Sequence, residues 1–240
     1  MSFDSGNRWT SSANTAIPQV GVDAGLRSYM LRVYNYMAIG LALTGIVAYG
    51  AVATGLYQAI AGTFIYWIVI FAPLGLVLLL SFRIQSMSLP AAQASFWGYA
   101  ALVGLSLAGL LLVYTGESVA RVFFITAATF LAMSLYGYTT KTDLAKFGSF
   151  LFMGLIGIVI ASVVNIFLAS SALQFMISVI GVIVFTGLTA WDTQNIKEMY
   201  WAGDDDVVAG KKAVMGALRL YLDFINLFVM LMQLMGNRRD

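Results

Sequence analysis

The sequence has no cysteine and no histidine among its 240 residues. Their absence excludes disulfide bonds, thiol nucleophiles, cysteine or histidine metal sites, and serine–histidine–aspartate triads. Charge is also scarce: only 10% of the residues are charged, against about 25% in a typical soluble domain. Hydrophobic residues make up 60% of the chain. The formal net charge is only +2, which provides no basic surface for nucleic acid. We therefore expect a chain whose solvent is largely lipid and which binds no nucleic acid.

Long runs without Asp, Glu, Lys or Arg predict the number of membrane spans, because a spanning helix needs about 20 mostly apolar residues. Four such runs occur, and the first and the last are each long enough for two spans. A further apolar segment near the C-terminus carries two charged residues inside it, Arg219 and Asp223. In chain order the five segments are residues 33–82, 84–116, 122–140, 147–191 and 213–235. The sequence therefore predicts an all-α integral membrane protein with seven transmembrane helices.

Turns and prolines refine this helix count. Glycine and small polar residues predict turns near residues 55–63 and 169–171, which divide the two longest runs. Pro90 is expected in the first turn of a helix, where its missing N–H does no harm. Pro73 falls in the middle of a predicted span and is expected to bend it, because it removes one backbone hydrogen bond.

Lysine and arginine near the helix ends predict the orientation in the membrane. If the N-terminus is cytoplasmic, nine of these residues lie inside and three lie outside. This bias favours a cytoplasmic N-terminus and an external C-terminus. Residues 1–25 are polar and lack the apolar run of a cleaved signal peptide, so we expect a flexible cytoplasmic tail there and one transmembrane domain over residues 26–240.

Ionisable side chains at membrane depth are the best functional candidates, because hydrocarbon disfavours a charge that has no cavity or partner. Asp192 closes the sixth predicted span and Asp223 lies in the seventh. Consecutive spans are antiparallel, so the two carboxylates can meet. A pair of this kind is expected to share one proton, and thus to sense pH without histidine. A less specific interpretation leaves Asp192 at the membrane surface and has Arg219, one turn away, neutralise Asp223.

The same two carboxylates are the candidate metal ligands, because their oxygens suit Ca²⁺ or another hard cation. Asn226, Thr193 and Gln194 are expected to add neutral oxygens, and Arg219 is a further supporting polar residue. One geometric question is depth. If the last span starts at the membrane surface, Asp223 lies deeper than Asp192.

Several separate motifs occur in a fixed order along the chain. They are residues 120–130 (ARVFFITAATF), 134–139 (SLYGYT), 187–197 (GLTAWDTQNIK) and 221–228 (YLDFINLF). From about residue 25 to the C-terminus the sequence resembles the Bax inhibitor family, also called transmembrane Bax inhibitor motif proteins, in its bacterial, YccA-like branch.

This resemblance implies more than the composition does. It implies six helices packed around a central seventh, in a multi-pass protein of the bacterial inner membrane. It also implies a pH-sensitive passive calcium leak, gated by a di-aspartyl pair that matches Asp192 and Asp223. An arginine of the second helix can latch the pair in this family, and Arg83 is the local candidate. Neither an enzymatic activity nor a cofactor is implied, apart from Ca²⁺ as the transported or bound ion.

Three alternatives remain beside the leak. The YccA-like resemblance also suggests a non-transporting regulator that binds and restrains a membrane-bound ATP-dependent protease. An intramembrane aspartyl protease is disfavoured, because Asp223 follows Leu222 and Tyr221 rather than a Gly-x-Gly motif. An inverted-repeat transporter is disfavoured by the odd helix count and the lack of a visible repeat. The acidic residues 204–206 are expected to form a solvated loop, because they lack the spacing of a calcium loop.

Overall fold

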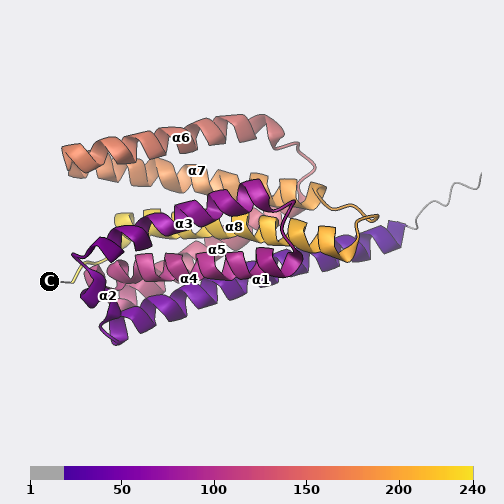
Figure 1. Cartoon of the computed structure of the whole chain (residues 1–240). Helices are drawn as coiled ribbons and strands as arrows, with labels where there is room; N and C mark the ends of the chain where they lie inside the picture. Colours follow the sequence, from indigo (N-terminus) through magenta and orange to yellow (C-terminus); the bar gives the residue numbers. More distant parts are fainter. Residues whose placement is uncertain (1–18, 240) are drawn as a thin grey trace, which may run out of the picture.

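The computed structural model describes residues 19–239, and these residues form an all-α bundle (Figure 1). Seven of its helices are long and apolar enough to cross a membrane, as the sequence predicted. In chain order the helices are α1 (Gln19–Ala53), α2 (Leu56–Ile60), α3 (Phe64–Arg83), α4 (Leu89–Val113), α5 (Gly116–Thr139), α6 (Ala145–Leu168), α7 (Ser171–Glu198) and α8 (Asp206–Met235). Most of the predicted tail lies outside the described residues, whereas residues 19–25 are already helical.

The expected turn over residues 55–63 contains an extra element, the five-residue helix α2. Gly55 and Gly62 flank this helix with φ angles of 74° and 83°, a conformation that glycine adopts without a Cβ clash. The second expected turn is confirmed, because α6 ends at Leu168 and α7 begins at Ser171. Between them Ala169 takes a left-handed conformation with a φ of 48°.

Both prolines lie where the sequence placed them. Pro90 occupies the first turn of α4, whose preceding Ser88 caps the helix by accepting a hydrogen bond from the Ala91 amide at 3.3 Å. Pro73 lies inside α3. The first proline therefore starts a helix, and the second lies within one.

Helix α8 is the central helix of the bundle. It packs against α1, α4, α5 and α7, and 61% of its most apolar window is buried. Its buried face holds Leu220, Tyr221, Phe224 and Leu227, each at most 3% exposed. This arrangement confirms the expected central seventh span. Within residues 19–239, α3 packs mainly on α4, and α6 packs on α7, so these two outer helices are attached through their neighbours.

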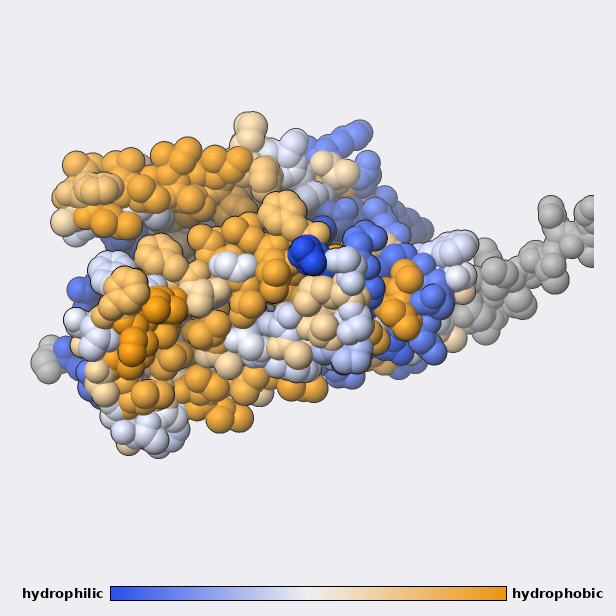
Figure 2. All heavy atoms as spheres, in the orientation of Figure 1, coloured by the Kyte–Doolittle hydropathy of each residue, from blue (hydrophilic) through white to orange (hydrophobic). Residues whose placement is uncertain are grey.

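The outer surface of the bundle is hydrophobic over most of its length and becomes hydrophilic at one end, on the right of the view (Figure 2). Helices α3 and α6 have the highest mean hydropathies of the seven spans, 2.4 and 2.6, yet only 11% and 6% of their windows are buried. Large apolar side chains are exposed on them, such as Phe64 at 79% and Phe167 at 83%. A surface of this kind is stable only in contact with lipid, and the protein is therefore a multi-pass membrane protein.

Helix lengths resolve the question of depth. Asp223 lies 17 residues after the start of α8, which is about 26 Å of helix, whereas Asp192 lies six residues, or about 9 Å, before the end of α7. Because Arg219, one turn before Asp223, reaches Asp192 at 3.7 Å, α8 has to begin well beyond the end of α7. This extension brings the two aspartates to the same level of the bundle.

Candidate functional site

Asp192 and Asp223 meet at the interface between α7 and α8. Their carboxyl groups are close enough to interact, since Arg219, one turn before Asp223 on α8, reaches Asp192 on α7 at 3.7 Å. Asp192 is 8% exposed and Asp223 is 4% exposed. The Oδ2 atom of Asp223 is buried and has no hydrogen-bond partner among the described residues. A buried carboxylate oxygen without a donor is costly unless a proton or a cation satisfies it, so the pair is suited to bind one or the other.

Arg219 supplies the positive charge at this site. One of its guanidinium nitrogens lies 3.7 Å from Oδ1 of Asp192. The less specific interpretation of the sequence had Arg219 neutralise Asp223, one turn away on the same helix, whereas the ion pair in the structure forms across the helix interface with Asp192. The arginine side chain is long enough to extend from α8 to the adjacent helix α7. The side chain of Arg219 is 43% exposed, whereas the side chain of Asp192 is 12% exposed.

Thr193 and Gln194 are buried beside Asp192, but their side chains serve other contacts. The Thr193 hydroxyl donates to the Thr189 carbonyl at 2.7 Å and lies 3.0 Å from the hydroxyl of Ser134. The Gln194 amide accepts from the Leu144 backbone N–H at 2.8 Å and donates to the Thr142 carbonyl at 2.9 Å. These two residues join α7 to α5 and to the loop before α6.

Asn226 lies three residues after Asp223 on α8 and is half-buried. Its amide nitrogen donates to the Leu222 carbonyl at 2.9 Å, within the same helix. Its Oδ1 accepts no hydrogen bond from any described residue. Of the predicted neutral ligands, Asn226 is therefore the one whose oxygen is left free near the pair.

Arg83 is the last residue of α3 and is exposed. The ion pairs found within residues 19–239 do not include it; they are Lys212 with Asp204 and Arg219 with Asp192. The structure thus places Arg219, rather than Arg83, against the aspartate pair, and a latch role for Arg83 stays a prediction.

The acidic residues 204–206 lie in the loop before α8 and at its start. Asp204 pairs with Lys212 at 2.5 Å, and Asp205 caps α8 by accepting a hydrogen bond from the Val208 amide at 2.7 Å. No group of three or more acidic side chains that could hold a metal occurs in the described part of the chain. The acidic loop thus has structural roles, and Asp192 and Asp223 remain the candidate cation ligands.

Sequence reasoning missed two polar contacts that hold the site in place. The Tyr34 hydroxyl of α1 lies 2.5 Å from the Ser134 hydroxyl, which in turn contacts Thr193 next to the site. The Thr44 hydroxyl of α1 lies 2.5 Å from the hydroxyl of Tyr221, two residues before Asp223. Single hydroxyls in apolar spans give little signal in a sequence, because their partners lie on distant segments.

Comparison with known proteins assigns the chain to a family. The family profile described as inhibitor of apoptosis-promoting Bax1 matches residues 26–240. This range includes both aspartates and all seven spans, apart from the first two residues of the first span. The match therefore covers the helical bundle except for the first residues of α1.

Individual relatives agree with this match. The chain is 51% identical to an uncharacterized protein of Rickettsia prowazekii, over 97% of this chain and 99% of the relative. It is 50% identical to the inner membrane protein YbhL of Escherichia coli, over 90% and 94% of the two chains. An uncharacterized membrane protein of Streptococcus pyogenes is 36% identical over 89% and 94%. The similarity extends over nearly the full length of each relative.

Proposed function

The chain belongs to the Bax inhibitor family of membrane proteins, and on that premise we propose that it is a passive leak for a hard cation, most readily Ca²⁺, gated by the Asp192–Asp223 pair. We place it in the bacterial inner membrane with a cytoplasmic N-terminus, as the name of its Escherichia coli relative and the distribution of basic residues suggest. The observation that supports the gate is the buried Asp223 oxygen without a partner, opposite a second carboxylate.

The number of ligands favours a transient cation site over a storage site. Ca²⁺ takes about six to eight oxygen ligands, and the pair supplies four carboxylate oxygens at most. Water has to complete the shell, so an ion at Asp192 and Asp223 is held weakly enough to leave. Conduction needs this kind of balance, in which an ion binds well enough to enter and weakly enough to exit.

Protonation supplies the gate in this proposal. When the pair holds a proton, the two carboxyl groups can hydrogen-bond to each other and the site has less negative charge for a cation. When the proton leaves, repulsion between Asp192 and Asp223 favours either a bound cation or a separation of α7 from α8. The ion pair between Arg219 and Asp192 opposes that separation by neutralising one of the charges.

The decisive experiment measures Ca²⁺ flux into proteoliposomes between about pH 6 and about pH 8, because a coupled carboxyl pair loses its protons in separate steps that a pH series can follow. We expect flux in the native protein whose pH dependence is lost in Asp192→Asn and in Asp223→Asn. The matched control is Asp206→Asn, which neutralises an exposed carboxylate in the first turn of α8 and is expected to keep the native profile.

Absence of flux above empty liposomes at every pH would overturn the leak. The aspartates would then be structural or signalling groups. The leading hypothesis would become a non-transporting regulator that binds and restrains a membrane-bound ATP-dependent protease.

A further inference from the structure

One face of the central helix α8 is less buried than the rest. Between Val208 and Gln233 its one exposed residue is Arg219, and several half-buried residues follow on the same side at helical spacing, whereas the half-buried Ile225 and Phe228 lie on the other side. This face consists of Met215, Arg219, Leu222, Asn226, Val229, Met230 and Gln233. It includes three polar residues at intervals of seven, which places them in a single row along the helix.

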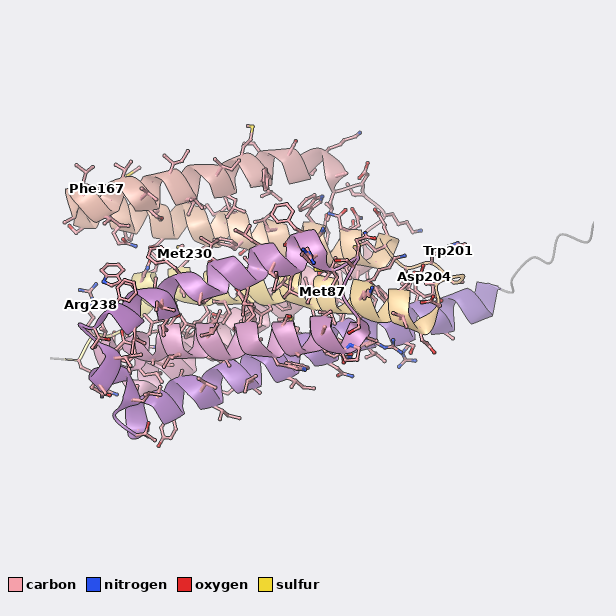
Figure 3. The ribbon with its side chains drawn as sticks, viewed as in Figure 1. Met87, Phe167, Trp201, Asp204, Met230 and Arg238 are labelled. Carbon is pink, nitrogen blue, oxygen red and sulfur yellow. The ribbon has the colours of Figure 1, made fainter. Side chains whose placement is uncertain are left out.

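This face lies in the gap left by two outer helices. Within residues 19–239, α3 packs mainly on α4 and α6 on α7, and neither packs closely on α8. The ribbon of α8 is visible between α3 and α7, and Met230 is labelled between the same two helices (Figure 3). The space-filling view shows a recess below the α6–α7 pair, with hydrophilic atoms inside it (Figure 2). A polar row facing lipid alone would be unfavourable, which favours water over lipid in this recess.

The C-terminal half of the row joins a polar cluster. The Gln233 side-chain oxygen accepts hydrogen bonds from Gln174 at 2.6 Å and from Ser178 at 2.8 Å, both on α7. Asn165 of α6 donates to Gln174 at 3.1 Å. Three helices thus contribute neutral amides and a hydroxyl near the end of α8. Neutral oxygens of this kind can replace part of the water shell of a hard cation.

The row leads from this cluster to the aspartate pair. Gln233 lies two residues before the end of α8, and it is ten residues, or about 15 Å, from Asp223. Asn226 lies between them, with its side-chain oxygen free of any described donor. Beyond the pair, Arg219 occupies the same face with a positive charge. The charges along the row therefore change from neutral to negative to positive.

We propose that Asn226 and Gln233, together with Gln174 and Ser178, line a water-filled half-channel that connects the C-terminal end of α8 with the aspartate pair, and that Arg219 closes its inner end. The half-channel admits a hydrated hard cation as far as Asp223. The guanidinium group of Arg219 repels the cation beyond that point. The identity of the ion rests on the proposed leak, whereas the presence of water does not.

Cysteine accessibility tests this inference cleanly, because the native chain has no cysteine. Asn226→Cys and Gln233→Cys are made singly, reconstituted in proteoliposomes and treated with a membrane-impermeant methanethiosulfonate ammonium reagent. This reagent reacts with thiolates, and a thiolate forms in water rather than in hydrocarbon. The matched control is Val159→Cys on α6, which is nine residues from the end of its helix, as Asn226 is from the end of α8. Val159 is 54% exposed and faces lipid.

We expect Asn226→Cys and Gln233→Cys to react at least about tenfold faster than Val159→Cys, although Val159 is the more exposed side chain of the two at matched depth. Equal reaction of Asn226→Cys and Val159→Cys, with both variants eluting like the native protein on size exclusion, would show that lipid fills the recess and would overturn the half-channel.

Flux measured on the same vesicles separates this inference from the leak. Reaction at Asn226→Cys together with loss of Ca²⁺ flux supports both. Reaction without any flux in the native protein leaves the half-channel standing and removes the leak. Flux that persists while Asn226→Cys stays unreactive assigns the ion another route and removes the half-channel.

Discussion

Helices α6 and α8 differ in both hydrophobicity and burial, and the more hydrophobic of the two is the less buried. Helix α6 has the highest mean hydropathy of the seven spans, 2.6, and 6% of its window is buried, whereas α8 has a mean hydropathy of 1.7 and 61% is buried. In water the more hydrophobic helix would be the inner one. In lipid the apolar helix gains nothing by leaving the hydrocarbon, so it stays outside, while the helix with aspartate, arginine and amides is covered by its neighbours.

The comparison also shows what stabilises the bundle. Small and aromatic side chains of α8 pack closely against α1, α4, α5 and α7. Much of the α6 surface is exposed to lipid instead. Close packing has to replace the hydrophobic drive that is missing between helices in a membrane. Matched substitutions on inner and outer helices therefore test whether burial, rather than hydrophobicity, determines stability.

The largest effect is expected for Phe224→Ala on α8. Phe224 is 3% exposed, and its ring lies 5.6 Å from that of Phe123 and 5.5 Å from that of Phe130. Removing a buried ring leaves a cavity and is expected to lower the free energy of unfolding by about 3–5 kcal/mol. The measurement is thermal unfolding in detergent micelles. Its readout is the fraction of protein that stays monodisperse on size exclusion after heating.

The control for this prediction is Phe167→Ala on α6, where the ring is 83% exposed. Its unfolding temperature should stay close to the native value. Equal losses of stability in Phe224→Ala and Phe167→Ala would contradict the division into an inner and an outer helix.

A smaller effect is expected for Gly137→Ala on α5. A Cβ atom at Gly137 would collide with the Ala190 backbone on α7, and a backbone carbonyl cannot turn aside as a side chain can. The two helices have to separate locally, which is expected to cost up to about 3 kcal/mol. On α6, a Cβ atom added at Gly157 would meet open space, so Gly157→Ala should leave the unfolding temperature unchanged. If both variants unfold alike, close approach of α5 and α7 is not needed.

The smallest effect concerns charge. Arg219→Gln on α8 removes the partner of Asp192 and is expected to shift the midpoint of the flux–pH profile, by less than about one pH unit because the arginine side chain is partly solvated. Arg83→Gln on the outer helix α3 tests the latch prediction under the same conditions. If the midpoint shifts only in Arg83→Gln, the counter-ion of the aspartate pair is Arg83 on α3 rather than Arg219 on α8.

Much of the fold could be predicted from the sequence, because charge is scarce enough to mark every span. The five apolar segments predicted seven crossings, and the structure has seven. Pro90 and the turn at residues 169–171 were placed correctly, since proline and helix-breaking residues act locally. The short helix α2 was missed, because five residues produce no hydrophobic period.

The site was predictable only in part. Asp192 and Asp223 were identified because a carboxylate in an apolar span is unusual whatever surrounds it. The partner of Arg219 was not identified, because the one pairing that sequence distance suggested was with Asp223 on the same helix, whereas the side chain reaches Asp192 across the interface. Thr193 and Gln194 were expected to face the pair, yet their hydrogen bonds go to α5 and to the loop before α6, which are distant in the sequence.

The sequence by itself determined the number of spans and the two aspartates at membrane depth. Both follow from single-residue transfer energies between water and lipid, which do not depend on neighbours. The tertiary structure alone decided that the two aspartates meet at one level, which residue pairs with Arg219, and which face of α8 is left uncovered. These depend on where α8 starts and on which helices pack against it, and close packing between distant segments fixes such relations.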